Sequence, residues 1–111
     1  MKHSKFQIFI GKDGQCYFRL VASNGEIILG SEGYVDSTDC LTGIHIVKIN
    51  SIDSNRYKKM KGVNGDFYFL LQSKNGEAVG KSQMYGTSQA RDMGISAVMN
   101  AAPEAKIEDL S

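Results

Sequence analysis

The stretch YFRLVASNGE, residues Tyr17–Glu26, occurs again 51 residues later as YFLLQSKNGE, residues Tyr68–Glu77. When the chain is placed against itself at this offset, Phe6–Ser51 aligns with Tyr57–Ala102 without a gap. Fourteen of the 46 aligned positions are identical, whereas average composition gives about three. The chain therefore contains two copies of one module.

The length of the chain limits how these two copies can fold. The sequence has 111 residues, so each copy has about 50, a size at which only roughly 60% of the unfolded surface can be buried. We therefore expect one domain, residues 1–111, in which repeat 1 (about residues 5–53) and repeat 2 (about residues 56–111) share a core. The expected oligomeric state is a monomer that is internally a covalent pseudo-dimer.

Composition and charge place few limits on function. Hydrophobic residues make up 41% of the chain and charged residues 23%, and a formal net charge of +1 indicates neither a nucleic-acid nor an acidic partner. No run of about 18 apolar residues marks a membrane span, and Met1–Lys5 leads into an alternating strand rather than into a signal-peptide core. We expect a cytoplasmic protein with no membrane partner.

The first half of each repeat has strand patterning. In repeat 1, Phe6–Ile10 and Cys16–Ala22 are extended runs joined by the tight turn Gly11–Gly14. The pair Asn24-Gly25 then predicts a type I′ hairpin turn, in which both central residues have positive φ, before a third strand at Glu26–Gly30. Repeat 2 is expected to follow the same order.

The second half of each repeat changes to helical spacing. Apolar and small residues recur every three or four positions behind a cap at Ser37/Thr38 in repeat 1 and at Thr87/Ser88 in repeat 2. Pro103 is expected to end the second helix, and Ala105–Leu110 to form a short last strand. The inward positions are Cys40, Gly43, Ile44, Val47 and Ser51 in one copy and Gly94, Ile95, Val98 and Ala102 in the other.

A glycine lies inside each expected helix, Gly43 in repeat 1 and Gly94 in repeat 2. Each should cost about 1 kcal/mol of helix stability relative to alanine. We expect this cost to be offset because a helix without a Cβ at that position can approach the sheet more closely.

Strand alternation divides the sheet into a helix-facing side and an open side. The uniformly apolar sets, expected to face the helices, are Cys16, Phe18 and Leu20 in one copy and Phe67, Phe69 and Leu71 in the other. Aromatic rings with scattered cations on the open side resemble the sheets that stack RNA bases, but a solvated sheet face explains the same residues. Candidate surface residues, from this side and from the matched strand-to-helix corners, are Tyr17, Arg19, Lys58, Tyr68, Tyr34 and Tyr85.

Residues that carry out chemistry are scarce. His3 lies near the terminus and His45 aligns with a serine, so no His-containing catalytic set occurs in both copies. Cys16 and Cys40 have no cysteine counterpart and no metal-ligand spacing, so both are expected to be reduced thiols. The basic run Arg56–Lys61 is expected to be an edge strand protected by lysines. We expect no catalytic, cofactor or metal site.

The combined motif resembles a known family. Tyr-Phe-x-Leu-x-x-x-Asn-Gly-Glu, Ser-x-x-Tyr and Gly-Ile-x-x-Val occur at Tyr17–Glu26, Ser31–Tyr34 and Gly43–Val47 and again 51 residues later, and this pattern resembles the YegP-like bacterial proteins over essentially the whole chain. The resemblance implies an α+β fold: two tandem β-β-β-α-β repeats form a single antiparallel sheet with both helices on one face, and their C-terminal strands are exchanged. It also implies no known function. One departure, Gly80-Lys81 in place of Leu29-Gly30, leaves the end of the third strand open.

The sequence therefore predicts an architecture more closely than an activity. The expected function is that of a small non-enzymatic binding or protein-interaction module. The alternative is single-stranded RNA binding through the aromatic and basic sheet face around Tyr17 and Tyr68. A protein partner is expected ahead of nucleic acid, and its identity lies beyond the sequence.

Overall fold

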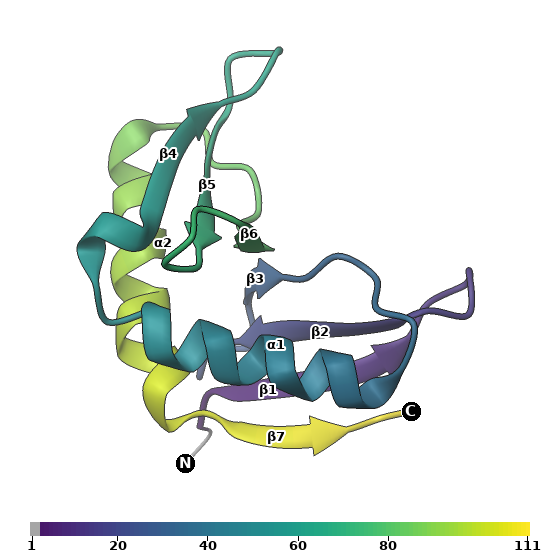
Figure 1. The fold of residues 1–111 in the computed structure, drawn as a ribbon. Helices are drawn as coiled ribbons and strands as arrows, with labels where there is room; N and C mark the ends of the chain where they lie inside the picture. The colour runs from purple at the N-terminus through teal and green to yellow at the C-terminus, as the bar shows by residue number, and fades with distance from the viewer. Residues whose placement is uncertain (1–2) are drawn as a thin grey trace.

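The structure, a computed structural model, describes residues 3–111 and contains two copies of the same strand and helix order. Each copy has three strands followed by a 14-residue helix, and a last strand closes the chain (Figure 1). Among the described residues no helix is long and apolar enough to cross a membrane. The elements are β1 (Lys5–Ile10), β2 (Cys16–Val21), β3 (Ile27–Gly30), α1 (Ser37–Asn50), η1 (Ser54–Arg56), β4 (Tyr57–Lys61), β5 (Phe67–Gln72), β6 (Ala78–Lys81), α2 (Ser88–Ala101), η2 (Ala102–Glu104) and β7 (Lys106–Asp109).

All seven strands form one sheet in the order β4-β5-β6-β3-β2-β1-β7. The last strand, β7, belongs to repeat 2 but pairs with β1 of repeat 1, which confirms the expected exchange for repeat 2. In residues 3–111 repeat 1 has no corresponding strand, because α1 is followed by η1 and then by β4, so the expected exchange in the other direction does not occur. The expectation of an all-antiparallel sheet is wrong at this one place, because β7 runs parallel to β1. A parallel neighbour needs a crossover connection, and here residues 11–105, most of both repeats, separate the two strands in sequence.

The two halves of the sheet meet at a single residue pair, Gly30 of β3 and Lys81 of β6. These two residues are 51 positions apart, so they are equivalent in the two repeats, and the pseudo-two-fold axis passes between them. We call this contact the β3–β6 seam. On either side of it the two halves turn steeply: β1, β2 and β7 cross the lower part of Figure 1, while β4 and β5 stand nearly upright.

Both helices pack against the side of the sheet that carries Phe18, Leu20, Phe69 and Leu71, as predicted. Helix α1 packs on β1 and β2 of its own repeat and also reaches β5 and β6, whereas α2 packs on β5 and reaches β3. The buried side chains of both repeats form one cluster. Each copy thus supplies part of the cover for the other, which is how two modules of marginal size obtain one adequate core.

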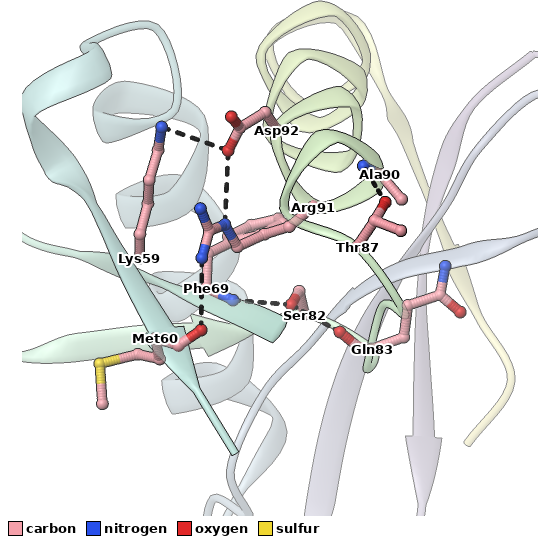
Figure 2. A network of polar contacts seen from close by, with 9 residues as sticks. All are labelled: Lys59, Met60, Phe69, Ser82, Gln83, Thr87, Ala90, Arg91 and Asp92. Carbon is pink, nitrogen blue, oxygen red and sulfur yellow. Dashed lines mark hydrogen bonds and ion pairs between the residues drawn. The ribbon is translucent and has the colours of Figure 1, made fainter. Parts of the chain in front are cut away.

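The helix caps correct one sequence expectation. Asp36, one residue before the predicted cap, accepts a hydrogen bond from the Asp39 backbone N–H at 2.9 Å and starts α1. Its repeat equivalent Thr87 accepts from the Ala90 N–H at 3.0 Å and starts α2, as predicted (Figure 2). The sequence alone does not identify Asp36 as the cap, because Ser37 and Thr38 beside it are also favourable capping residues.

The Asn-Gly turns also differ from the prediction. Gly25 has a φ of 90° and Gly76 a φ of 89°, but no residue other than glycine among those described has positive φ, so Asn24 and Asn75 do not adopt the type I′ conformation. In repeat 1 the Gly25 N–H donates to Ala22 O at 2.9 Å. Each turn is therefore a three-residue loop that ends in a glycine bulge, a form in which only the glycine needs positive φ.

The third strands end at equivalent residues, Gly30 and Lys81, which resolves the end left open by the sequence. Leu29, in β3, is fully buried, and a Cβ placed on Gly80 would lie 2.7 Å from one of its methyl carbons. Positions 29 and 80 are equivalent and lie beside the pseudo-two-fold axis, so they compete for one space. The Leu29 side chain fills that space, and Gly80 leaves room for it.

Candidate binding surface on the open sheet face

The side chains that match between the repeats mostly hold the fold together. Ser31 Oγ accepts a hydrogen bond from the Phe18 N–H at 2.9 Å and donates to the Glu32 carbonyl. Ser82 does the same for the Phe69 N–H at 2.9 Å and for the Gln83 carbonyl (Figure 2). These serines thus satisfy strand N–H groups where the third strand leaves the sheet.

The matched tyrosines form the next part of the same corner. Tyr34 and Tyr85 each make a two-bond backbone bridge, to Cys16 and to Phe67 respectively. Their rings lie over the helix glycines: a Cβ on Gly43 would be 2.5 Å from the Tyr34 hydroxyl oxygen, and one on Gly94 would be 2.6 Å from Tyr85 Cζ. The glycines therefore admit a tyrosine ring rather than the strand backbone. Tyr34 and Tyr85 lie on the helix side of the sheet, away from the other four candidate residues.

The open side of repeat 1 carries a connected row of side chains. The Phe9 and Tyr17 rings stack with centroids 5.7 Å apart, and the Arg19 guanidinium lies 4.6 Å from the Phe9 centroid. Arg19 Nε donates to Gln7 Oε1 at 2.8 Å, and Gln7 Nε2 donates to Glu108 Oε1 on β7, also at 2.8 Å. This row joins three strands, and among the described residues only Nε of the Arg19 guanidinium donates a hydrogen bond within it.

Hydrogen bonds and neighbouring charge shift the pKa values along this row. The Gln7 amide and the Lys5 ammonium, 3.5 Å away, lower the pKa of Glu108. The Tyr17 hydroxyl donates to Asp13, and this bond lowers the pKa of the Asp13 carboxyl and raises that of the Tyr17 phenol. Over the intermediate pH range the row therefore holds fixed carboxylates at both ends and a cation near its centre.

The open side of repeat 2 is more apolar and carries separate cations. The Lys81 ammonium lies 4.9 Å from the Tyr68 ring centroid. Lys58 is exposed beside the half-buried Met60 and Leu70, which face the same side because Lys58 pairs with Leu70 and Met60 with Tyr68. This half thus offers apolar contact area flanked by two lysines.

The open sides of the two repeats are joined through the β3–β6 seam. Arg19, Gly30, Lys81 and Leu70 are paired in one row across β2, β3, β6 and β5, so all four face the open side. A Cβ on Gly30 would meet no atom within 4 Å, so bare backbone lies between the two cations. Tyr17 and Tyr68 lie three strands apart on opposite sides of this row, a separation on the order of 20 Å. They do not form one stacking platform.

Sequence reasoning placed four candidates on this surface and missed two. Tyr17, Arg19, Lys58 and Tyr68 lie there, whereas Phe9 and Lys81 belong to it but were not selected. Phe9 alternates with the buried Ile8 and could have been found from strand periodicity. Lys81 could not, because its position depends on the pairing of β6 with β3.

A second polar network lies at the junction of β4 and α2 (Figure 2). The Arg91 side chain is only 12% exposed; its guanidinium lies 5.3 Å from the Phe67 centroid and donates from Nη1 to the Met60 carbonyl at 3.5 Å. Asp92 pairs with Lys59 at 3.2 Å, and hydrogen bonding to Lys59 lowers the Asp92 pKa. The network ties the outer strand of the sheet to the helix.

Phe67 and Arg91 of this network correspond to Cys16 and Cys40 in repeat 1. Both cysteines are buried free thiols, as predicted. Burial raises the pKa of Cys40 to about 12, which keeps the thiol protonated and unreactive. Among residues 3–111 no group of three or more His, Cys, Asp or Glu side chains is arranged to hold a metal ion.

Comparison with known proteins follows the duplicated architecture. A family model described as "Domain of unknown function (DUF1508)" matches residues 12–57 and again residues 63–109. The chain belongs to the DUF1508 family. It is 43% identical over 105 residues to the UPF0339 protein in ptx operon 5'region of Stutzerimonas stutzeri, covering 95% of each chain. It is 40% identical over 104 residues to the UPF0339 protein YegP of Escherichia coli K12, covering 94% of each.

Two solved structures have the same fold as this chain. The solution NMR structure of E. coli YegP matches with a TM-score of 0.92 at 38% identity, covering 99% of this chain and 95% of that one. The solution NMR structure of a UPF0339 protein from Shewanella oneidensis matches with a TM-score of 0.90 at 37% identity, covering 96% and 91%. The YegP-like resemblance and the α+β fold are thereby confirmed. The descriptions of these relatives assign no activity, so no site residue is transferred from them.

Proposed function

We propose that this DUF1508 protein is a small cytoplasmic, non-enzymatic module that binds a partner protein through the open face of its sheet. One observation carries the proposal: both helices pack on the same side, and the other side presents partly exposed rings and cations on both halves of the sheet, joined across the β3–β6 seam by bare backbone at Gly30. Aromatic and arginine side chains are enriched at protein interfaces, where they supply contact area and directed hydrogen bonds.

The distribution of matched residues supports the same proposal. Most identities shared by the repeats are used in turns, corners and the core. On the open side Tyr17 and Tyr68 match, but their neighbours differ: Arg19 corresponds to Leu70, and Phe9 to Met60. An interface that accepted two identical partners would favour identical residues. A single partner that crosses the seam accounts for a polar half and an apolar half.

Affinity capture with surface variants tests this proposal. The wild-type chain is compared with a Phe9→Ala/Arg19→Ala/Tyr68→Ala variant, and with His45→Ala as a control for an exposed residue on α1. We expect the same partner protein with wild type and control and its loss with the triple variant, confirmed by binding of the purified pair. Equal capture by all three proteins would refute the role of this surface.

The second candidate function is binding of single-stranded RNA. It is favoured by two aromatic rings that each have a cation beside them, Arg19 at Phe9 and Lys81 at Tyr68. A labelled oligonucleotide and fluorescence anisotropy test it directly. Tyr17→Ala with Tyr68→Ala should weaken binding by about 1–3 kcal/mol per stacked base, with strong salt dependence and unchanged thermal stability. Nuclease-resistant capture of a protein partner, together with no salt-dependent anisotropy signal, would leave the protein interface as the function.

A further inference from the structure

Strand β4 is an outer edge of the sheet with unused backbone groups. It pairs with β5 on one side, and no other described strand lies on its other side. The Gly62 N–H donates to the Asp66 carbonyl at 2.6 Å, so by the alternation of an antiparallel ladder the N–H and C=O groups of Lys59 and Lys61 point outward. Such an edge can accept a further strand.

The equivalent edge in repeat 1 shows what such a strand looks like. There β7 pairs in parallel with β1, and the Leu110 N–H donates to the Ile8 carbonyl at 2.8 Å. Ile8 is the residue equivalent to Lys59. One copy of the module therefore carries its covering strand, whereas no strand in the described part of the chain, 3–111, pairs with the outer side of β4.

Connectivity explains the difference between the copies. After α2 the chain continues through η2 into β7, which crosses to the other repeat. After α1 the positions equivalent to β7 are residues 55–58, and these already complete η1 and begin β4 itself. Because residues 55–58 connect the two repeats, they cannot also form a strand that covers the outer edge of β4.

The charge of the open edge indicates what could fill it. The residues of β1 that pair with β7 are Lys5, Phe6, Gln7 and Ile8, and the equivalent residues along β4 are Arg56, Tyr57, Lys58 and Lys59, three of them cations. On β7, Glu108 pairs with Lys5 at 3.5 Å and accepts from Gln7 at 2.8 Å. Two β4 edges brought together would oppose like charges, which disfavours a second copy of this chain. A strand with acidic side chains would instead place carboxylates opposite the cations of β4.

The backbone of β4 is held in place for such an encounter. Lys59 forms an ion pair with Asp92, and Arg91 extends from α2 to the Met60 carbonyl (Figure 2). Tyr57, at the start of β4, is buried and donates from its hydroxyl to the Ser51 carbonyl at 2.7 Å. A rigid edge loses little conformational entropy when a strand is added.

We propose that the β4 edge binds an extended acidic segment of a partner protein, added in parallel as an eighth strand in the way β7 is added to β1. The backbone of Lys59 supplies the hydrogen bonds and Lys58 faces a partner carboxylate. Lys58 borders both this edge and the open sheet face. The backbone hydrogen bonds belong to the edge alone, so the proposal stands whether or not the open face binds anything.

Amide exchange with a defined peptide tests this inference. The probe is an acetylated peptide that copies Glu104–Ser111 with Lys106→Glu, because position 106 would face Arg56. Its control carries neutral amides in place of the two carboxylates equivalent to Glu108 and Asp109. In the ¹⁵N-labelled full chain we expect slowed exchange of the Lys59 amide with the acidic peptide, lost at high salt, and weaker binding of the control. Shifts centred on Ile8, showing displacement of β7, would overturn the proposal, as would none at millimolar peptide.

A matched pair of variants isolates the backbone contribution. Lys59→Pro removes the outward N–H without removing a bond to β5, whereas Lys59→Gln removes the ion pair with Asp92 and keeps the N–H. Binding should weaken by about three- to tenfold more in the proline variant than in the glutamine variant. Tyr17→Ala, on the open sheet face, should bind the peptide like wild type. Equal binding by the proline and glutamine variants would show that charge alone attracts the peptide and would refute strand addition; if the proline variant does not fold, the exchange measurement on the wild type decides.

Discussion

Exchanging Leu29 and Gly80 tests the shared core at its pseudo-two-fold axis. The two positions are equivalent in the repeats, and they compete for one buried space that a single leucine fills. In the double variant Leu29→Gly/Gly80→Leu the leucine would enter the same space from β6 instead of β3. Because the composition is unchanged, the strand propensities of glycine and leucine nearly cancel, and the variant reports packing across the axis.

The magnitudes follow from the environment of the two residues. Leu29→Gly removes a fully buried side chain and should cost about 3–5 kcal/mol. Gly80→Leu alone must place a side chain where a Cβ already lies 2.7 Å from Leu29, so overpacking should cost about 1–3 kcal/mol or more. If the core is shared as described, the double variant should lie within about 2 kcal/mol of wild type, giving a large favourable coupling.

Urea unfolding followed by far-ultraviolet circular dichroism measures all four proteins, since the chain contains no tryptophan for fluorescence. An unchanged m-value would show that the variants share one denatured state. If the cost of the double variant equals the sum of the single costs, the two positions do not share a space, and the description of the axis is wrong.

Three further predictions follow from single structural features. Gly25→Val and Gly76→Val should each cost about 1–3 kcal/mol in the same assay, because both glycines have φ near 90°; a neutral result at either site would contradict the bulged turn. The pKa of Tyr17, read from absorbance at high pH, should fall toward 10.0 in Asp13→Asn, because the hydrogen bond to Asp13 raises it. That hydrogen bond stabilises the fold at intermediate pH, and its effect is lost as pH rises through the folded-state pKa of Tyr17 or falls through the folded-state pKa of Asp13. An unchanged Tyr17 pKa in the variant would argue against the hydrogen bond. Residues 1–62 alone should not fold as a monomer, because each repeat contributes only part of the shared core. In this fragment Leu29→Ala should favour a concentration-dependent dimer, because a symmetric dimer would place two copies of Leu29 at the axis, where there is space for one. A cooperatively folded monomer, measured by light scattering and thermal unfolding, would disprove the shared core.

The sequence by itself determined the repeat, the order of its elements and the two faces of each strand. These features are local: period-two alternation at Cys16–Leu20, helical spacing around Ile44 and Ile95, and glycines at turns all express chemistry within a few residues. The exact turn form was wrong at Asn24-Gly25 because an Asn-Gly pair is compatible with both a type I′ turn and a glycine bulge.

The candidate surface was predictable only in part. Tyr17 and Arg19 share a strand face that alternation reveals, and Phe9 could have been added by the same rule. Tyr34 was grouped with them because it matches a second tyrosine, but its ring packs over Gly43 on the other side of the sheet. Matching between repeats reports shared structural need and carries no information about which face a side chain occupies.

Only the tertiary structure decided how the two copies are joined. The pairing of Gly30 with Lys81 places the pseudo-two-fold axis, brings Arg19 and Lys81 into one row, and explains why position 80 is glycine where position 29 is leucine. The same topology covers one outer edge with β7 and leaves the edge at β4 open. The sequence of one repeat indicates the strands and helix that each module forms, because those depend on neighbouring residues. The contacts between the modules join residues that are distant in sequence, and they depend on the space left after both modules have packed.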